Sequence, residues 1–246
     1  MKKYIFLFAI SILFSCSSDN NSSNADSQNE SSGQGGSLAS FTIVNDYLYT
    51  VDDSSLNIFS IVNNEQPSKV NDIPIGFRIE TIFNYKEFLY MGSTMGMYIY
   101  SLENPEAPVY KSEVQHFTAC DPVIANDTHA FVTLHSETIC GNNINILEVY
   151  DVTNVLQPFL VSSRNLSSPK GIGLYGDYLF VCDDDIKIFD VSNPNEMVLV
   201  SSIDKNAFDV IIKDNLLIVI GENGLYQYSL DILNIENIQS LSSILF

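Results

Sequence analysis

The side chains best suited to chemistry lie in two segments of this chain, each of which holds one histidine and one cysteine. His116 and Cys120 belong to the first segment, and His135 and Cys140 belong to the second. A fold that brings the segments together allows a disulfide between the cysteines or a zinc site made of all four side chains. None of them forms a close pair of the C-x-x-C or H-x-x-x-H type, so the disulfide is the favoured interpretation.

Acidic residues are the second candidate for a site. They cluster in two short stretches and recur once near the end of the chain, at Asp52, Asp53, Asp183, Asp184, Asp185 and Glu222. Converging carboxylates suit a hard cation such as Ca²⁺ or a cationic partner. None of the stretches has the D-x-[DN]-x-[DN]-G spacing of a dedicated calcium loop. Turn chemistry and a solvated acidic rim are therefore the simpler interpretation, and we assign no metal site.

The sequence offers little else for catalysis. It contains no G-x-S-x-G motif, no P-loop and no G-x-G-x-x-G motif. We therefore assign no catalytic residue, and a non-catalytic role is the main expectation. The alternative is an enzyme that acts on glycans through an acidic or metal-assisted site, for which the best residues are Asp53, Asp183, Asp184, His116 and His135.

The composition describes one folded and strongly acidic domain. Of the 246 residues, 46% are apolar and 17% are charged, which is enough apolar material for a sizeable core. Lys and Arg number 11 against 30 Asp and Glu, which gives a net charge of -19. Such a field repels the phosphate backbone of nucleic acids and excludes them as partners.

The first residues have the features of an export signal. Two lysines precede an apolar run over residues 4–14, which is shorter than the roughly 20 residues that a permanent membrane span needs. The run ends in Leu-Phe-Ser-Cys at residues 13–16, which resembles the lipobox of bacterial lipoproteins. The resemblance implies cleavage after residue 15, acyl chains such as palmitate on Cys16, and a membrane anchor.

A polar segment joins this anchor to the rest of the chain. Residues 16–38 are rich in Ser and Asn and contain no Lys or Arg, as is typical of a flexible, disordered tether. Ser17 after the lipidated cysteine resembles the sorting preference for the outer membrane. We therefore expect a cell-envelope protein with a signal peptide at 1–15 and a folded domain at 39–246. In that oxidising compartment we expect Cys120 and Cys140 to be joined and Cys182 to be a buried free thiol.

The domain is built from one unit that is repeated five times. An apolar-x-apolar-aromatic motif occurs in each unit and ends at Phe59, Tyr100, Tyr150, Phe189 and Tyr228. An acid-led strand precedes each motif, and an Asn-led turn follows the first four, at Asn63, Asn104, Asn154 and Asn193. A period of about 40 residues is typical of repeat architectures.

Each unit holds four short β-rich stretches separated by turn residues. In the first unit they lie at Phe41–Val44, Tyr47–Val51, 56–61 and 70–75. Many stretches are apolar on both faces, as sheets stacked between neighbouring sheets require. The predicted fold class is therefore all-β, a β-propeller of five four-stranded blades. The loop that enters a blade and the hairpin between its second and third strands share a face, which places Cys120 close to Cys140 and gathers the acidic hairpins.

The units resemble those of the LVIVD-repeat family of exported β-propellers. The best matches are Phe-Asp-Val-Ser-Asn-Pro at 189–194 and Tyr-Asp-Val-Thr-Asn at 150–154. The resemblance covers nearly all of residues 40–246, and the molecular function of the family is undefined. Ser60 and Ser101 replace the repeat's Asp in the first two units. This Asp is therefore not a ligand that all the units share.

Together these features predict a membrane-anchored, extracytoplasmic propeller that acts as a non-catalytic binding or scaffold module. Its partners are expected to be the membrane, through the lipid on Cys16, and an envelope protein or extracellular ligand held on one face of the disc. We expect no resident cofactor, and Ca²⁺ at the acidic face is the alternative.

Overall fold

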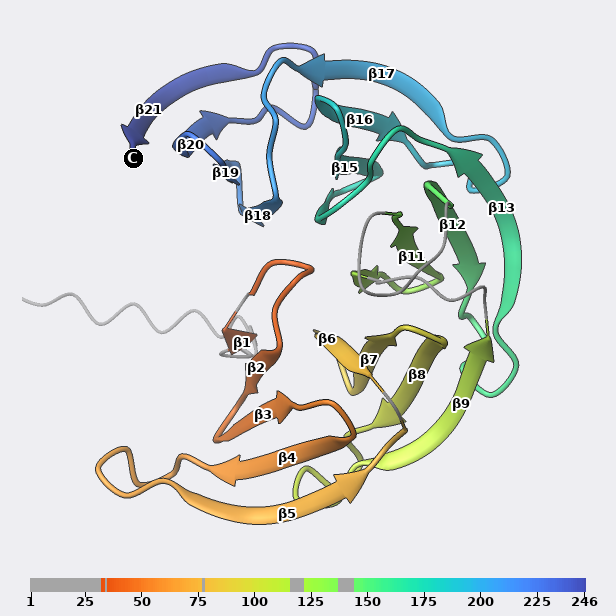
Figure 1. Ribbon diagram of the computed structural model, residues 1–246, viewed down its shortest axis with the longest axis vertical. Helices are drawn as coiled ribbons and strands as arrows, with labels where there is room; N and C mark the ends of the chain where they lie inside the picture. Colours follow the sequence, from red (N-terminus) through yellow and green to blue (C-terminus); the bar gives the residue numbers. More distant parts are fainter. Residues whose placement is uncertain (1–31, 34, 77, 116–121, 137–143) are drawn as a thin grey trace, which may run out of the picture.

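The computed structural model describes residues 32, 33, 35–76, 78–115, 122–136 and 144–246. The 21 elements in these residues are all β-strands, which form five antiparallel sheets in chain order. Figure 1 shows the sheets arranged around a central axis as the five blades of a propeller, which confirms the predicted fold class. No helix in the described part of the chain is long and apolar enough to cross a membrane.

Each blade is a meander of four strands that runs outward from the axis, and blade 1 carries one short extra strand at its inner edge. Blade 1 comprises β1 (Ser32–Gly33), β2 (Phe41–Val44), β3 (Tyr47–Val51), β4 (Ser55–Ser60) and β5 (Ser68–Pro74). Blade 2 comprises β6 (Ile79–Tyr85), β7 (Phe88–Ser93), β8 (Gly96–Ser101) and β9 (Val109–Gln115). Blade 3 comprises β10 (Val123–Ala125), β11 (His129–Leu134), β12 (Ile146–Asp151) and β13 (Phe159–Asn165). Blade 4 comprises β14 (Ile172–Tyr175), β15 (Tyr178–Cys182), β16 (Ile186–Asp190) and β17 (Val198–Ile203). Blade 5 comprises β18 (Asp209–Lys213), β19 (Leu216–Gly221), β20 (Gly224–Ser229) and β21 (Gln239–Leu245).

Tight turns join the first and second strands of four blades. The first residue of each two-residue turn has a positive φ, namely 52° at Asn45, 49° at Lys86, 58° at Gly176 and 54° at Asp214. A positive φ at this position matches the twist of the two strands that the turn connects. The third blade has a three-residue turn between β10 and β11 instead.

The repeated aromatic residue lies at a β-bulge in every blade. The register between the third and fourth strands shifts immediately before each of the five residues: Phe59, Tyr100, Tyr150, Phe189 and Tyr228. A bulge bends its strand and increases the local twist. The motif found in the sequence thus marks the point at which each blade bends along the rim, as the outer strands in Figure 1 show.

Apolar side chains are buried between neighbouring blades. Four clusters fill the junctions of blade 1 with 2, 2 with 3, 3 with 4, and 4 with 5. In the last of these, Ile186, Ile188, Val210 and Leu217 are at most 1% exposed. Burying one aliphatic side chain of this size contributes roughly 1.5–3 kcal/mol. Packing of blade on blade is therefore the main source of stability.

Polar contacts at the rim reinforce the first three junctions. The Asn71 side chain donates to the Glu106 carbonyl at 2.8 Å, which links the outer strand of blade 1 to a turn of blade 2. Ser112 and Ser162 make the equivalent bonds from blades 2 and 3 to the blades that follow. On the outer strand of blade 5, the Ser242 hydroxyl instead bonds to Gln227 of its own blade at 2.8 Å.

The junction of blade 5 with blade 1 differs from the other four. No buried apolar cluster joins these two blades within the described residues. Strand alternation puts Phe41 on the side of blade 1 that faces away from blade 2, and Ile220 and Ile244 on the side of blade 5 that faces away from blade 4. They are 56%, 41% and 64% exposed. In Figure 1 an interval separates the ribbons of the two blades at the left of the view.

Polar contacts near the axis connect blade 1 to blades 4 and 5, and we call them the axial clasp. The Ser37 hydroxyl donates to Asp209 Oδ1 at 3.1 Å, and the Leu38 N–H donates to Oδ2 at 3.3 Å. Ser37, which is 1% exposed, also accepts a bond of 2.7 Å from the Ile172 N–H. These residues belong to the end of the predicted tether, so ordered structure begins before residue 39.

Candidate functional site

The hairpin between β3 and β4 uses Asp52 to shape its own turn. Asp52 Oδ1 accepts bonds from the N–H groups of Ser54 at 3.0 Å and Ser55 at 2.9 Å. Its other oxygen accepts a bond from Asn57 Nδ2 at 3.0 Å. The bond from the Ser54 N–H makes the largest contribution in holding the pKa of Asp52 below its ordinary value. This carboxylate is therefore committed to the turn.

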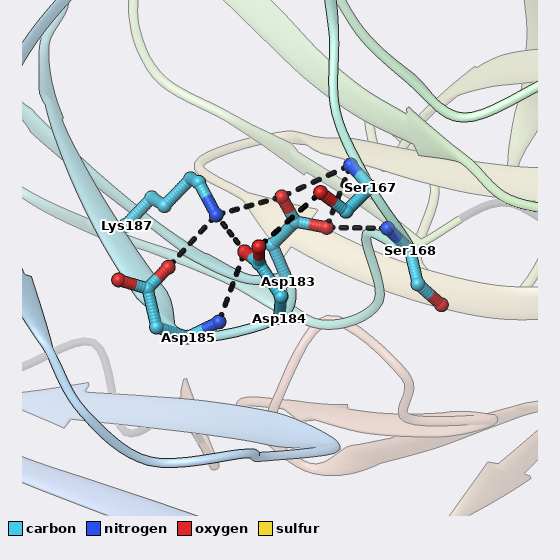
Figure 2. A network of polar contacts seen from close by, with 6 residues as sticks. All are labelled: Ser167, Ser168, Asp183, Asp184, Asp185 and Lys187. Carbon is cyan, nitrogen blue, oxygen red and sulfur yellow. Dashed lines mark hydrogen bonds and ion pairs between the residues drawn. The ribbon is translucent and has the colours of Figure 1, made fainter.

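The hairpin between β15 and β16 carries the densest acidic cluster, and one lysine neutralises part of its charge. Lys187 Nζ lies 3.0 Å from Asp183 Oδ2 and 2.8 Å from Asp185 Oδ1. The same ammonium group contacts Asp184. Figure 2 shows the three carboxylates gathered around this single cation. The cluster therefore presents less negative charge to solvent than its sequence suggests.

Asp183 has a second set of partners on the loop that enters blade 4. Its oxygens accept bonds of 3.0 and 3.1 Å from the Ser167 N–H and a further bond from the Ser168 N–H. Asp183 is 2% exposed, and a buried carboxylate is stable only when it is paired and hydrogen-bonded. Asp183 thus holds the loop against the hairpin, as Figure 2 shows.

The other predicted site residues lie apart from this cluster. Asp53 and Glu222 are exposed in the hairpins of blades 1 and 5, and His135 is half-buried beyond β11. Within the described residues, no group of three or more His, Cys, Asp or Glu is placed so that it could hold a metal ion. Four of the predicted residues fall outside the described ranges: Cys16, His116, Cys120 and Cys140. The lipid anchor, the disulfide and the zinc alternative therefore stay predictions.

Cys182 is a buried free thiol, as predicted. It ends β15 and is 0% exposed, and burial raises the pKa of its thiol. A buried thiol with a raised pKa is a poor nucleophile, so packing explains Cys182.

His129 is half-buried in β11, where its Nδ1 lies 2.8 Å from the Thr128 hydroxyl and burial lowers the pKa of the imidazole.

Sequence reasoning missed the carboxylate at the centre of the ring. Asp209 accepts the bonds of the axial clasp, and Gly36 and Gly171 lie so close to its side chain that a Cβ at either position would clash with it. Burial raises the pKa of Asp209, against the opposing effect of its hydrogen bonds. No local pattern marks this residue, because its partner Ser37 is 172 positions away.

A cavity of about 400 Å³ lies at the axis, and we call it the axial pocket. Residues of β2, β6, β10 and β14 and of the turns beside them line it. Its polar and aromatic lining includes Phe41, Phe83, Asn84, Tyr85 and Asn126. Pockets of this size, apolar with a few directed polar groups, are typical of sites for small ligands.

The axial pocket and the acidic hairpins lie at opposite ends of the strands. Asn84 and Tyr85 are at the end of β6, and Asn126 follows β10, next to the turns into the second strands. The second strand of each blade then runs antiparallel, away from that turn, to the hairpin that holds Asp52 or Asp183. The propeller therefore has an acidic face and, on the other side, a pocket lined by aromatic and amide groups.

Blade 4 shows the repeat in its most complete form. The LVIVD repeat family matches residues 168–205, which contain all four strands of this blade. The chain is a five-bladed β-propeller, and one of its blades matches the LVIVD repeat model. No curated protein matches its sequence.

Solved structures share the fold of this propeller at low sequence identity. A protein of unknown function from Desulfotomaculum acetoxidans is 12% identical with a TM-score of 0.67, over 86% of this chain and 68% of that one. A Lactobacillus plantarum protein is 10% identical with a TM-score of 0.67, over 82% and 73%. The periplasmic gluconolactonase of Pseudomonas aeruginosa is 11% identical with a TM-score of 0.61, over 81% and 67%. At these identities the likeness shows the fold alone.

The repeat's Asp and Asn have structural roles in this propeller. Asp190 Oδ1 accepts a bond from the Ser192 N–H at 2.9 Å, and Asn193 Oδ1 accepts one from the Asn195 N–H at 3.3 Å. In blade 2 the Ser101 hydroxyl takes the place of the Asp carboxylate and accepts from the Glu103 N–H at 3.1 Å. The repeated polar residues thus form the turn between the third and fourth strands.

Proposed function

We propose that this chain is a non-catalytic binding module of the bacterial cell envelope, anchored to a membrane through a lipid on Cys16, which holds a small extracellular ligand in the axial pocket. The anchor rests on the lipobox-like residues 13–16 and the polar segment that follows them. The observation that carries the binding role is the axial pocket of about 400 Å³ with its aromatic and amide lining.

The partners of the acidic residues favour binding over hydrolysis. An acid or base must reach its substrate with a free carboxyl group. Asp183 is buried and bonded to Lys187 and to two backbone N–H groups, while Asp184 also contacts Lys187. These are two of the five residues on which the glycan-acting alternative relies; Asp53, His116 and His135 are the others. The gluconolactonase that shares the fold shows only that a periplasmic enzyme can be built on this architecture.

The anchor is tested by expressing the full chain in a Gram-negative host with labelled palmitate. We expect the label and the protein in the membrane fraction, and both to be lost from that fraction in the Cys16→Ser variant. A Cys16→Ser protein that stays in the membrane would refute the anchor.

The binding role is tested by native mass spectrometry of the full chain after incubation with envelope extract. We expect a retained ligand mass that is lost in Phe41→Ala, where a 56% exposed ring of the pocket is removed. Phe159→Ala is the matched control, because Phe159 is 59% exposed on the rim of blade 3. Equal retention by Phe41→Ala, or no retained mass in any variant, would refute the proposal.

A further inference from the structure

The axial pocket combines aromatic rings with an apolar wall. Phe41 is 56% exposed, and Tyr85 of blade 2 is half-buried and packs against the apolar cluster between blades 2 and 3. Ile82, Ala125 and Leu174 form the apolar part. An exposed ring gives a flat face on which the apolar face of another ring can stack at low entropic cost.

The two asparagines of the lining offer one acceptor and one donor. Asn84 uses its Nδ2 to donate to the carbonyls of Lys86 at 2.8 Å and Phe88 at 3.1 Å, so its Oδ1 remains as an acceptor. Asn126 uses its Oδ1 to accept from the N–H groups of Thr128 at 3.0 Å and His129 at 2.8 Å, so its Nδ2 remains as a donor. Neither remaining atom has a partner in the part of the chain that the structure describes. Hydroxyl groups suit this pair, because each can donate to one atom and accept from the other.

The charges around the pocket disfavour ionic ligands. Lys86 at the turn pairs with Asp127 on the neighbouring blade, and neither is part of the lining. The chain as a whole carries a net charge of -19, which repels anions. The unsatisfied donor of Asn126 is unsuited to a cation, since a cation offers no acceptor.

From these features we propose that the axial pocket binds a neutral pyranose ring, as part of an uncharged oligosaccharide, without cleaving it. One face of the sugar stacks on Phe41, while neighbouring hydroxyl groups bond to Asn84 Oδ1 and Asn126 Nδ2. This inference rests on the proposed function, since it names the chemical class of the ligand for the same pocket.

The test is a titration of the full chain with maltose, cellobiose, lactose and N,N'-diacetylchitobiose, monitored by saturation-transfer NMR and calorimetry. We expect at least one of these neutral disaccharides to bind. Glucose 6-phosphate and choline serve as the anionic and cationic probes, and both should bind more weakly. Absence of binding by all four disaccharides, or preferential binding of either charged probe, would overturn the inference.

Asn126→Asp separates binding from folding. An aspartate keeps an oxygen that accepts the two turn bonds and replaces the Nδ2 donor with a second, negatively charged acceptor, so affinity should fall about tenfold or more while the melting temperature stays unchanged. Asn104→Asp is the control, because Asn104 Oδ1 makes the same kind of turn bond far from the pocket, to the Glu106 N–H at 3.2 Å. Wild-type affinity in Asn126→Asp would contradict the inference.

The two proposals can fail separately. A retained envelope ligand that is lost in Phe41→Ala but is not a saccharide would leave the binding role standing and refute the sugar. Absence of both a retained mass and disaccharide binding in the wild-type chain would refute the two together.

Discussion

The junctions on the two sides of blade 5 are built from the same repeat and are sealed differently. Toward blade 4, Val210 and Leu217 are buried against Ile186 and Ile188. Toward blade 1, Ile220 stays 41% exposed, and the described contacts are the polar bonds of the axial clasp. A β-propeller unit is apolar on both faces because each face packs against a neighbouring blade in a closed ring. The difference shows that repetition supplies the faces, while closure of the ring needs separate residues.

The largest expected effect comes from removing a buried side chain at the sealed junction. Ile188→Ala leaves a cavity between blades 4 and 5 and should lower the free energy of unfolding by about 2–5 kcal/mol. Ile220→Ala, on the opposite side of blade 5, should lower it by about 0.5 kcal/mol or less. Urea denaturation measures both, and losses of similar size would show that the two junctions are equally packed.

Removing the carboxylate of the axial clasp should have the next largest effect. Asp209→Ala leaves the Ser37 hydroxyl and the Leu38 N–H without their acceptors, at a cost of about 1–3 kcal/mol. Hydrogen exchange followed by mass spectrometry should show faster exchange at residues 35–40. Unchanged exchange there would mean that the clasp does not hold blade 1 to the ring.

The turn between the third and fourth strands allows a smaller comparison of blades 4 and 5. Asp190→Ala removes the bond to Ser192 and should cost about 1 kcal/mol, whereas Asp190→Ser, which copies Ser101 of blade 2, should restore most of it. Asp231→Ala removes a bond of the same kind, from the Leu233 N–H, in the corresponding turn of blade 5 and should cost less, because that blade is sealed on one side. Denaturation curves of the three variants give the loss in free energy of unfolding for each. A larger loss for Asp231→Ala than for Asp190→Ala would contradict the comparison.

The smallest effect concerns the pH dependence that the clasp confers. Burial raises the pKa of Asp209 in the folded state above its ordinary value. Its contribution to stability is therefore complete below the unfolded pKa of about 3.9 and is lost as the pH rises through the folded pKa. The amide of Asp209→Asn does not titrate. The melting temperature of this variant should therefore rise relative to that of the wild type as the pH increases from about 3 to 6. A difference that is constant with pH would contradict this assignment.

The sequence contained enough information to predict the blades and most of their strands. Phe41–Val44 and Tyr47–Val51 have the predicted bounds, because their apolar alternation and the turn at Asn45 mark both ends. The outer strand was predicted at 70–75 and is found at Ser68–Pro74. It begins earlier because Ser68 and Lys69 pair with β4 through the backbone, which requires no apolar side chains.

The candidate site was less predictable. The acidic run at 183–185 is plain in the sequence, and Lys187, which offsets part of its charge, lies only two residues beyond it. The pocket residues Asn84 and Asn126 carry a weaker signal, since asparagine before a turn is common for structural reasons alone. Only the three-dimensional arrangement shows that one blade contributes a free acceptor and the next a free donor.

The axial clasp also sets an order in time. Each blade is a meander of strands that are neighbours in the sequence, so it can form soon after its own residues have left the ribosome. Ser37 is synthesised 172 residues before Asp209. The bond between them can therefore form only after the four blades that lie between them in the sequence have been synthesised. Closure of the ring is therefore a late event in the life of the nascent chain, and it is completed by the segment that emerged first.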